Sequence, residues 1–255
     1  FECPDFFELP VDGTSDQRRW VLLGANSEYA IGTFDGTRFT PEQSRLPGHR
    51  GQGFYAPQTF SDIRAEDGRR IQIGWFQTET KGMSFNQSMT VPIELRLAST
   101  ASGPRMTFTP VRELEGLRAR TFQADGRTLH AGDPNPFAKV RGDALELRAD
   151  FEPGSAREVV FRVRGATVVY NVAKEELVVD GHKAPAPLRE GRQAITIYAD
   201  RTGLEVFASG GLTYVPKPFQ PRAEDQSVEV DVKGGSAVFR TLRAYPLRSI
   251  WKGSR

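Results

Sequence analysis

A four-residue stretch at the start of the chain carries side chains that could do acid–base chemistry. Glu2 places a carboxylic acid beside the thiol of Cys3, and Pro4 and Asp5 follow directly. Because proline cannot donate a hydrogen bond to a strand ladder, Pro4 favours an exposed strand edge over a central strand. A carboxyl group on such an edge, facing a cavity, is suited to general acid catalysis. The stretch is also compatible with a surface glutamate beside a buried cysteine.

Aromatic side chains recur in short motifs further along the chain, and two of them suit sugar binding. Tyr55 lies in FYAPQTF (residues 54–60), and Trp75 ends RIQIGW (residues 70–75). An aromatic face can pack on the apolar side of a sugar ring, and a phenol can hydrogen-bond near a reacting centre. Both residues are also compatible with the core of a sheet. Three motifs follow: QSMTVPIEL (87–95), LEVF with two later glycines (204–211), and YPLRSIW (245–251).

The ECPD stretch and these five motifs together resemble glycoside hydrolase family 32, the fructan and sucrose hydrolases. Each motif is short, but they follow the order and spacing of the family from Phe1 to about Trp251. The family combines a β-propeller that carries the active site with a β-sandwich. The resemblance therefore implies an all-β chain that holds the last blades of a five-bladed β-propeller, followed by a C-terminal β-sandwich.

The resemblance also implies roles for individual residues. Glu2 corresponds to the acid/base, which protonates the leaving oxygen and then deprotonates the attacking water. Tyr55 and Trp75 correspond to residues that line the pocket for the terminal fructose, and Gln58 is expected to be structural. The family places its cysteine near the acid/base, which makes Cys3 a candidate for substrate contact. Strand alternation points Cys3 away from Glu2, and this favours a packed core thiol with an indirect effect.

The catalytic nucleophile expected from the resemblance is missing from this chain. Retaining glycosidases need two carboxyl groups about 5–5.5 Å apart. The family's nucleophile is an aspartate in an Asn-Asp-Pro-Asn-Gly type motif, and an Arg-Asp-Pro motif binds the fructosyl hydroxyls; the sequence contains neither. Asp5 cannot readily replace the nucleophile, because three residues along a strand it faces away from Glu2. We therefore expect the C-terminal part of a longer enzyme, whose N-terminal part supplies the nucleophile.

Composition excludes several other classes of protein. Lys and Arg number 34 and Asp and Glu 32, and this near balance, a net charge of +2, argues against a nucleic-acid partner. The sequence has no apolar run of the roughly 18 residues that a membrane helix needs. Cys3 is the single cysteine, so an internal disulfide and a thiolate zinc cluster are excluded. The compartment stays open, with a secreted or periplasmic location preferred.

Two further sequence features do not predict a ligand. The glycine-rich segment 48–53 lacks the strand-to-helix context of a phosphate cradle, and it is expected to be a loop that leads into Tyr55. His49, His130 and His182 are far apart in the sequence and lack the carboxylate spacing of a metal site. We therefore expect neither a metal nor a cofactor.

The elements that must position these residues are strands. Short strand patterns separated by turns such as Asp35-Gly36 form one four-stranded blade, and a second blade follows. Residues 111–117 favour one or two turns of helix, and the remaining strands lack βαβ spacing, which favours a two-sheet sandwich. The predicted domains are residues 1–104 and 105–255. The strands are expected near residues 3–9, 20–24, 29–34, 38–41, 55–60, 70–76, 88–95, 106–109, 144–151, 159–163, 167–172, 176–179, 193–198, 204–207, 227–232 and 237–244.

The function expected from these observations is retaining hydrolysis of terminal β-D-fructofuranosyl residues in fructans or sucrose. The alternative is a non-catalytic carbohydrate-binding protein built from a degraded propeller and a lectin-like sandwich. An intact ECPD motif would have no purpose in such a protein, which favours the enzyme. The sequence does not choose between levan, inulin and sucrose, between exo and endo action, or between oligomeric states.

Overall fold

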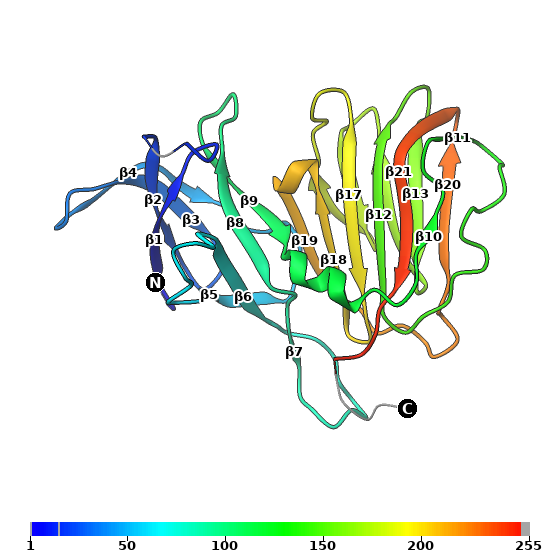
Figure 1. The fold of residues 1–255 in the computed structure, drawn as a ribbon, viewed down its shortest axis with the longest axis horizontal. Helices are drawn as coiled ribbons and strands as arrows, with labels where there is room; N and C mark the ends of the chain where they lie inside the picture. The colour runs from blue at the N-terminus through cyan, green and yellow to red at the C-terminus, as the bar shows by residue number, and fades with distance from the viewer. Residues whose placement is uncertain (1, 15, 251–255) are drawn as a thin grey trace.

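The computed structural model describes residues 2–14 and 16–250, and strands dominate this part of the chain. Figure 1 shows two small sheets beside a larger double-layered body, which confirms the prediction of an all-β protein. Phe1 and Trp251, which belong to two of the motifs above, lie outside the described residues. Neither of the two short 3-10 helices in the described ranges is long or apolar enough to cross a membrane.

The first sheet is an antiparallel meander of four strands in chain order. Its third hairpin turns at Asp35, whose Oδ1 accepts hydrogen bonds from the backbone N–H groups of Thr37 and Arg38 at 2.8 and 2.7 Å. This arrangement confirms the predicted first four-stranded unit. The strands are β1 (Asp5–Pro10), β2 (Arg18–Leu23), β3 (Tyr29–Phe34) and β4 (Phe39–Leu46).

The second sheet repeats this plan with one interruption. The predicted strand 88–95 divides in two at Pro92, which cannot donate to a ladder, so a short β7 pairs with β6 before β8 begins. The last strand, β9, pairs with β8 along its whole length and therefore carries the sheet six residues beyond residue 104. The strands are β5 (Phe54–Thr59), β6 (Arg70–Phe76), β7 (Ser88–Met89), β8 (Ile93–Ala98) and β9 (Arg105–Pro110).

The two small sheets pack face to face. Alternation in β1 points Phe7 and Leu9 into a shared core with residues of β8 and β9, and a single parallel bridge joins Val11 to Leu97. The opposite face of the first sheet carries a half-buried group of aromatic rings, which we call the outer aromatic face. Within it Phe6 stacks on Trp20 at 4.6 Å between ring centroids. Its members are Phe6, Trp20, Phe34 and Phe39.

A 3-10 helix, η1 (Arg112–Leu117), leads into two larger sheets, as the sequence predicted. The seven-stranded sheet has the order β10-β21-β12-β17-β18-β19, with β11 also on β21, and the five-stranded sheet has the order β16-β15-β14-β13-β20. Their facing sides share one apolar core, so the expected two-sheet sandwich is confirmed. The strands are β10 (Phe122–Gln123), β11 (Arg127–His130), β12 (Leu145–Glu152), β13 (Glu158–Val163), β14 (Ala166–Asn171), β15 (Glu176–Val179), β16 (His182–Pro185), β17 (Gln193–Ala199), β18 (Gly203–Ala208), β19 (Thr213–Pro218), β20 (Val228–Lys233) and β21 (Ser236–Pro246).

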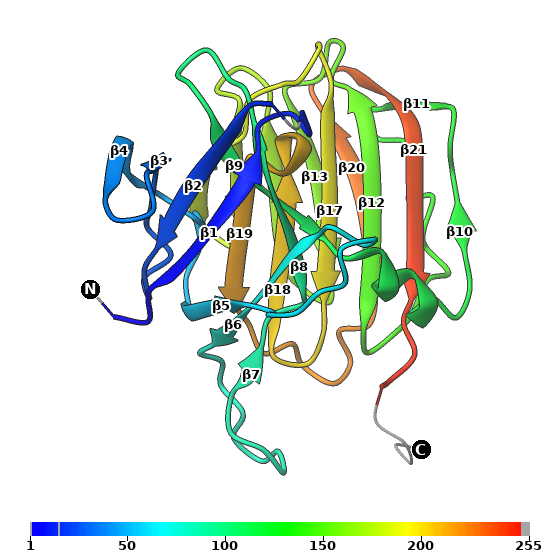
Figure 2. The same cartoon turned by 60° about the vertical axis from the view of Figure 1, so that its left-hand side comes forward.

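The seven-stranded sheet has a second buried face, which packs on the second small sheet. Along β18, Leu204 and Val206 point into the sandwich core, while Phe207 joins the core of the small sheets. Tyr214 of β19 and Tyr198 of β17 lie in that same core, so Tyr198 packs between the two parts of the chain rather than between the sandwich sheets. Burial on both sides explains why every residue of β18 is buried. Figure 2 shows this sheet behind the small ones.

Candidate active site

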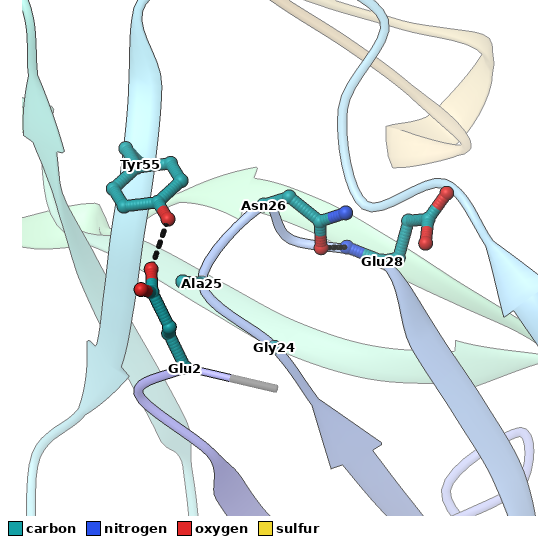
Figure 3. Close-up of a pocket in the computed structure, with 6 residues that line it drawn as sticks. All are labelled: Glu2, Gly24, Ala25, Asn26, Glu28 and Tyr55. Carbon is teal, nitrogen blue, oxygen red and sulfur yellow. Dashed lines mark hydrogen bonds between the residues drawn. The ribbon is translucent and has the colours of Figure 1, made fainter.

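The site lies where the segment before β1, the β2–β3 turn and the start of β5 meet. The backbone carbonyl of Glu2 accepts a hydrogen bond from Ala25 N at 2.9 Å, and the carbonyl of Ala25 accepts one from Ala56 N at 2.7 Å. These two bonds tie three separate stretches of the chain together at one end of the small sheets. Figure 3 shows Glu2 and Tyr55 approaching each other from opposite sides of Ala25.

Glu2 and Tyr55 form the central contact of the site. The Tyr55 hydroxyl donates a hydrogen bond of 2.5 Å to Glu2 Oε2. This bond is the main cause that raises the pKa of Tyr55 above its usual 10.0, because it favours the protonated phenol. The pair borders a pocket of about 240 Å³, and the Glu2 side chain remains exposed to solvent. The residues that line the pocket are Glu2, Gly24, Ala25, Asn26, Glu28 and Tyr55.

A β-bulge in β5 sets the direction of the Tyr55 side chain. Tyr55 pairs with Trp75 across β6, but the register shifts before Gln58, which pairs with Ile73. Within the bulge Ala56 has φ = 46°, a left-handed conformation that costs a non-glycine residue on the order of 1–2 kcal/mol. Bulges of this kind occur beside active sites, where they redirect a side chain. The hydrogen bond from Ala56 N holds the bulge in place.

Trp75 lies beside the pocket rather than in its lining. Its ring makes an edge-on contact with Tyr55, with 6.3 Å between centroids and planes inclined by 77°. Its indole Nε1 donates a hydrogen bond to Gln87 Oε1, and 39 % of the residue is exposed. An exposed ring fixed on its polar side can offer its face to a ligand. The structure therefore brings together Glu2, Tyr55 and Trp75 at one end of the small sheets.

The prediction that Cys3 is a packed core thiol was wrong. Cys3 is exposed and has φ = 44°, and β1 begins only at Asp5, so strand alternation does not apply to it. The carbonyl oxygen of Cys3 accepts a hydrogen bond of 3.1 Å from Gln58 Nε2, which agrees with the structural role expected for Gln58. Cys3 thus lies next to Glu2 with a free thiol at the surface.

Asp5 is committed to the backbone. Its Oδ2 accepts a hydrogen bond of 2.7 Å from Thr59 N at the end of β5, so it fastens the first sheet to the second. Asp5 thus has a structural contact in this part of the chain, and it is not among the residues that line the pocket.

The pocket also contains two residues that the sequence analysis missed, Asn26 and Glu28. Both belong to the β2–β3 turn, where Asn26 Oδ1 accepts a hydrogen bond from Glu28 N at 3.0 Å. In Figure 3 the Glu28 carboxyl points away from Glu2, on the far side of Asn26. The turn itself was readable from the Asn26-Ser27 pair between two strand patterns. The position of this turn beside Glu2 could not be predicted, because it depends on how the strands of the first sheet pair.

The histidines form no metal site among the described residues. Burial lowers the pKa of His49 to about 4, with smaller contributions from the nearby charges of His182 and Arg50. His49 Nδ1 accepts a hydrogen bond from Gly51 N at 3.1 Å. Across the described part of the chain, no group of three His, Cys, Asp or Glu residues could hold a metal ion.

The arrangement can perform one half of a two-carboxylate reaction. Glu2 can give or take a proton at the mouth of the pocket, and Tyr55 holds its carboxyl in one orientation. The only other carboxyl in the pocket lining, within the described ranges, is Glu28, which is directed elsewhere. A nucleophile across from Glu2 is therefore not formed by these residues.

Comparison with known proteins identifies the family. Residues 1–110 match the glycosyl hydrolases family 32 N-terminal domain, and residues 113–246 match the glycosyl hydrolases family 32 C-terminal domain. A levanase of Bacillus subtilis is 31% identical over 98% of this chain, which covers 43% of the levanase. An extracellular exo-inulinase of Aspergillus ficuum is 22% identical, with 98% of this chain and 55% of that protein covered.

Solved structures share the fold. The exo-inulinase of Aspergillus awamori superposes with a TM-score of 0.81 at 21% identity, over 98% of this chain and 57% of its own. Fructan 1-exohydrolase IIa of Cichorium intybus superposes with a TM-score of 0.76 at 17% identity, over 97% of this chain and 61% of its own. The chain thus spans between 43% and 61% of the length of these relatives. Its two matched domains place it in glycoside hydrolase family 32.

Proposed function

We propose that this chain contributes the acid/base half of the active site of a retaining fructoside hydrolase. The reaction is the release of terminal β-D-fructofuranosyl residues from fructans or sucrose. The observation that carries this proposal is the pocket in which Glu2 meets Tyr55 at 2.5 Å. Family membership supports it, and so do the names of the relatives, a levanase and exo-inulinases.

Glu2 acts twice in the proposed mechanism. It first donates a proton to the glycosidic oxygen while a carboxylate attacks the anomeric carbon, so that the leaving sugar departs as an alcohol. It then takes a proton from the water that cleaves the fructosyl–enzyme bond. Tyr55 is the positioning group for Glu2, because its hydroxyl fixes the carboxyl that must face the leaving oxygen.

Trp75 and Cys3 complete the proposed binding site. Trp75, edge-on to Tyr55 and partly exposed, would lie against the apolar side of the terminal fructose. Cys3 would contact the substrate at the rim, where its thiol is exposed beside Glu2.

The nucleophile is proposed to come from a stretch of the protein that precedes Glu2. Two observations support this origin: Glu28 points away from Glu2, and the relatives are longer than the stretch they share with this chain. The complementary carboxylate would stand about 5–5.5 Å from Glu2 across the pocket, as retention requires.

We also propose that the two small sheets are the last blades of a five-bladed propeller. Each is built on an antiparallel meander of four strands, to which the second sheet adds the short β7, and the two stack face to face as blades do. The outer aromatic face would then pack on the preceding blade, which would bury its half-exposed rings. Because β9 pairs with β8, we propose that the propeller part includes residues 105–110 and ends before η1.

The proposal is tested on the whole protein with levan, inulin and sucrose as substrates. Retention predicts that the first fructose released is the β-anomer, which NMR detects before mutarotation. Glu2→Gln is expected to lower kcat by roughly 10²–10⁴-fold while the substrate still binds. The matched control is Glu8→Gln, a glutamate on β1 that pairs with Arg18 at 2.6 Å, and it should retain turnover.

Two results would overturn the proposal. One is an α-anomer as first product, since this would mean inversion. The other is binding of fructan by the wild-type protein without any turnover, which would support the carbohydrate-binding alternative instead.

A further inference from the structure

One buried carboxyl group of the sandwich, that of Glu205, points toward the small sheets. Glu205 on β18 is 5 % exposed; its Oε1 accepts a hydrogen bond from Val91 N at 2.7 Å, and its Oε2 one from the Tyr214 hydroxyl at 2.6 Å. Its other neighbours are Tyr198, opposite it on β17, and Asp200 in the β17–β18 turn. No basic side chain of residues 2–14 and 16–250 forms an ion pair with Glu205. A buried carboxyl is costly, so two well-formed hydrogen bonds mark a specific role.

The first of these bonds leads to Trp75. Val91 follows Thr90, which holds Gly74 from both sides: Thr90 N donates to Gly74 O at 3.0 Å, and Gly74 N donates to Thr90 Oγ1 at 3.1 Å. Gly74 directly precedes Trp75 on β6. Glu205 therefore fixes the segment that fixes the backbone of Trp75.

The second bond leads to Tyr55 through Tyr214. The ring of Tyr214 stacks on Phe207 at 4.8 Å and meets the edge of Phe54 at 5.6 Å between centroids. The backbone carbonyl of Tyr214 accepts a hydrogen bond of 2.7 Å from Arg50 N in the glycine-rich segment before β5. Phe54 directly precedes Tyr55, so the hydroxyl that binds Glu205 belongs to the residue that anchors the start of β5.

The glycine-rich segment is built for this contact with β19. Gln52 N donates to Pro216 O at 2.8 Å, and a Cβ atom on Gly51 would stand 1.9 Å from that same carbonyl oxygen. Only glycine permits so close an approach. The segment is thus hydrogen-bonded to β19, the edge strand of the sandwich. Because the segment runs directly into β5, the position of β19 also sets the position of Tyr55.

We infer that Glu205 is a positioning residue for the pocket, through which the sandwich sets the places of Trp75 and Tyr55. The inference rests on the proposed function in one respect: the pocket that these two side chains border must be the fructoside site. Misplacement of a group in an active site by about 1 Å can lower the rate on the order of 100-fold. Loss of a distant positioning residue such as Glu205 should therefore have a measurable effect.

The protonation of Glu205 makes this positioning role dependent on pH. Burial raises the pKa of this carboxyl to about 8; Asp200 adds to the effect, and the hydrogen bonds from Tyr214 and Val91 oppose it. Glu205 therefore keeps its proton to a higher pH than an exposed glutamate, and a charge is expected to appear in the contact between the two parts of the chain around pH 8. A change in the surroundings of Trp75 is expected in the same pH range.

The test uses the whole protein labelled with 5-fluorotryptophan, with the Trp75 signal in the ¹⁹F NMR spectrum assigned from Trp75→Phe. Glu205→Leu removes both hydrogen bonds and is expected to shift the Trp75 signal and to lower kcat/KM at least about tenfold, mainly through KM. The matched control is Leu177→Ala in the five-stranded sheet, which opens a cavity in the sandwich core away from this contact. It should lower the melting temperature and leave the Trp75 signal and KM unchanged.

Glu205→Gln keeps the shape of the side chain and removes its titration. The wild-type Trp75 signal should move with a midpoint near pH 8, and the signal of Glu205→Gln should stay constant. This comparison decides the matter even if Glu205→Leu does not fold. A Trp75 signal that is flat in both proteins would overturn the inference, as would a folded Glu205→Leu with wild-type signal and KM. If the wild-type protein turns over no fructoside, the proposed function fails. The ¹⁹F measurements still test whether Glu205 positions Trp75.

Discussion

Replacing Glu205 with glutamine is expected to change how the free energy of unfolding depends on pH. Burial raises the pKa of Glu205 from the usual 4.5 to about 8 in the folded protein. Between these values the folded state holds a proton that the unfolded chain has released. The free energy of unfolding therefore falls as pH rises across this window, and the contribution of Glu205 is complete only below it.

The size of the effect follows from the same two values. One pH unit corresponds to about 1.4 kcal/mol for one proton, so the window from 4.5 to about 8 amounts to roughly 5 kcal/mol. This is an upper value, because any water that reaches the carboxyl lowers its pKa. This amount is a large fraction of the roughly 5–15 kcal/mol by which domains are stable.

Chemical denaturation at a series of pH values measures the effect. The free energy of unfolding of the wild-type protein minus that of Glu205→Gln should decrease steadily from pH 4.5 to about 8. Glu66→Gln, an exposed glutamate in the turn between β5 and β6, controls for the change in net charge and should show no such trend. A wild-type minus Glu205→Gln difference that stays within about 0.5 kcal/mol over the window would refute the reasoning, since it lies in the range of ordinary surface substitutions.

Three further changes have defined outcomes. Arg118 donates two hydrogen bonds of 2.7 Å to the buried Glu146, and Glu146→Ala leaves its guanidinium without this partner. Thermal denaturation should show a loss of roughly 3 kcal/mol in the free energy of unfolding. A loss no larger than that of a surface substitution would contradict this. Gly51→Ala forces a methyl group onto Pro216 O and should cost about 1–3 kcal/mol, with faster hydrogen exchange at Arg50 N; wild-type exchange would contradict the close approach. Tyr55→Phe removes the hydrogen bond to Glu2 and should lower kcat/KM roughly tenfold, whereas unchanged kinetics would exclude the proposed positioning role.

Local patterns were enough to predict most of the strands. The strand 176–179 coincides with β15, and the turn at Asp35 forms the β3–β4 hairpin, because alternation and turn residues act over a few neighbours. The two small sheets and the sandwich follow from the same patterns. The site residues Glu2, Tyr55 and Trp75 came from family motifs rather than from periodicity, and the structure brings them together.

Contacts between distant segments could not be predicted in this way. β19 was not predicted; it contains Pro216 and Pro218, which an edge strand tolerates, and the glycine-rich segment covers this edge. Cys3 was misplaced because alternation was extended to a residue that precedes the strand. Glu205 reads as the polar position of an ordinary strand, and only the packing of the small sheets on the sandwich reveals its burial.

The proposed role of Glu2 as the proton donor is tested most directly by varying the leaving group. In Glu2→Gln of the whole protein, we compare kcat/KM for sucrose with that for p-nitrophenyl β-D-fructofuranoside, whose phenolate departs without a proton. Glu2 as the acid predicts that cleavage of sucrose falls by roughly 10²–10⁴-fold, while formation of the fructosyl–enzyme from the activated substrate falls far less. An equal fall for both substrates, or no fall for sucrose, would contradict the assignment of Glu2.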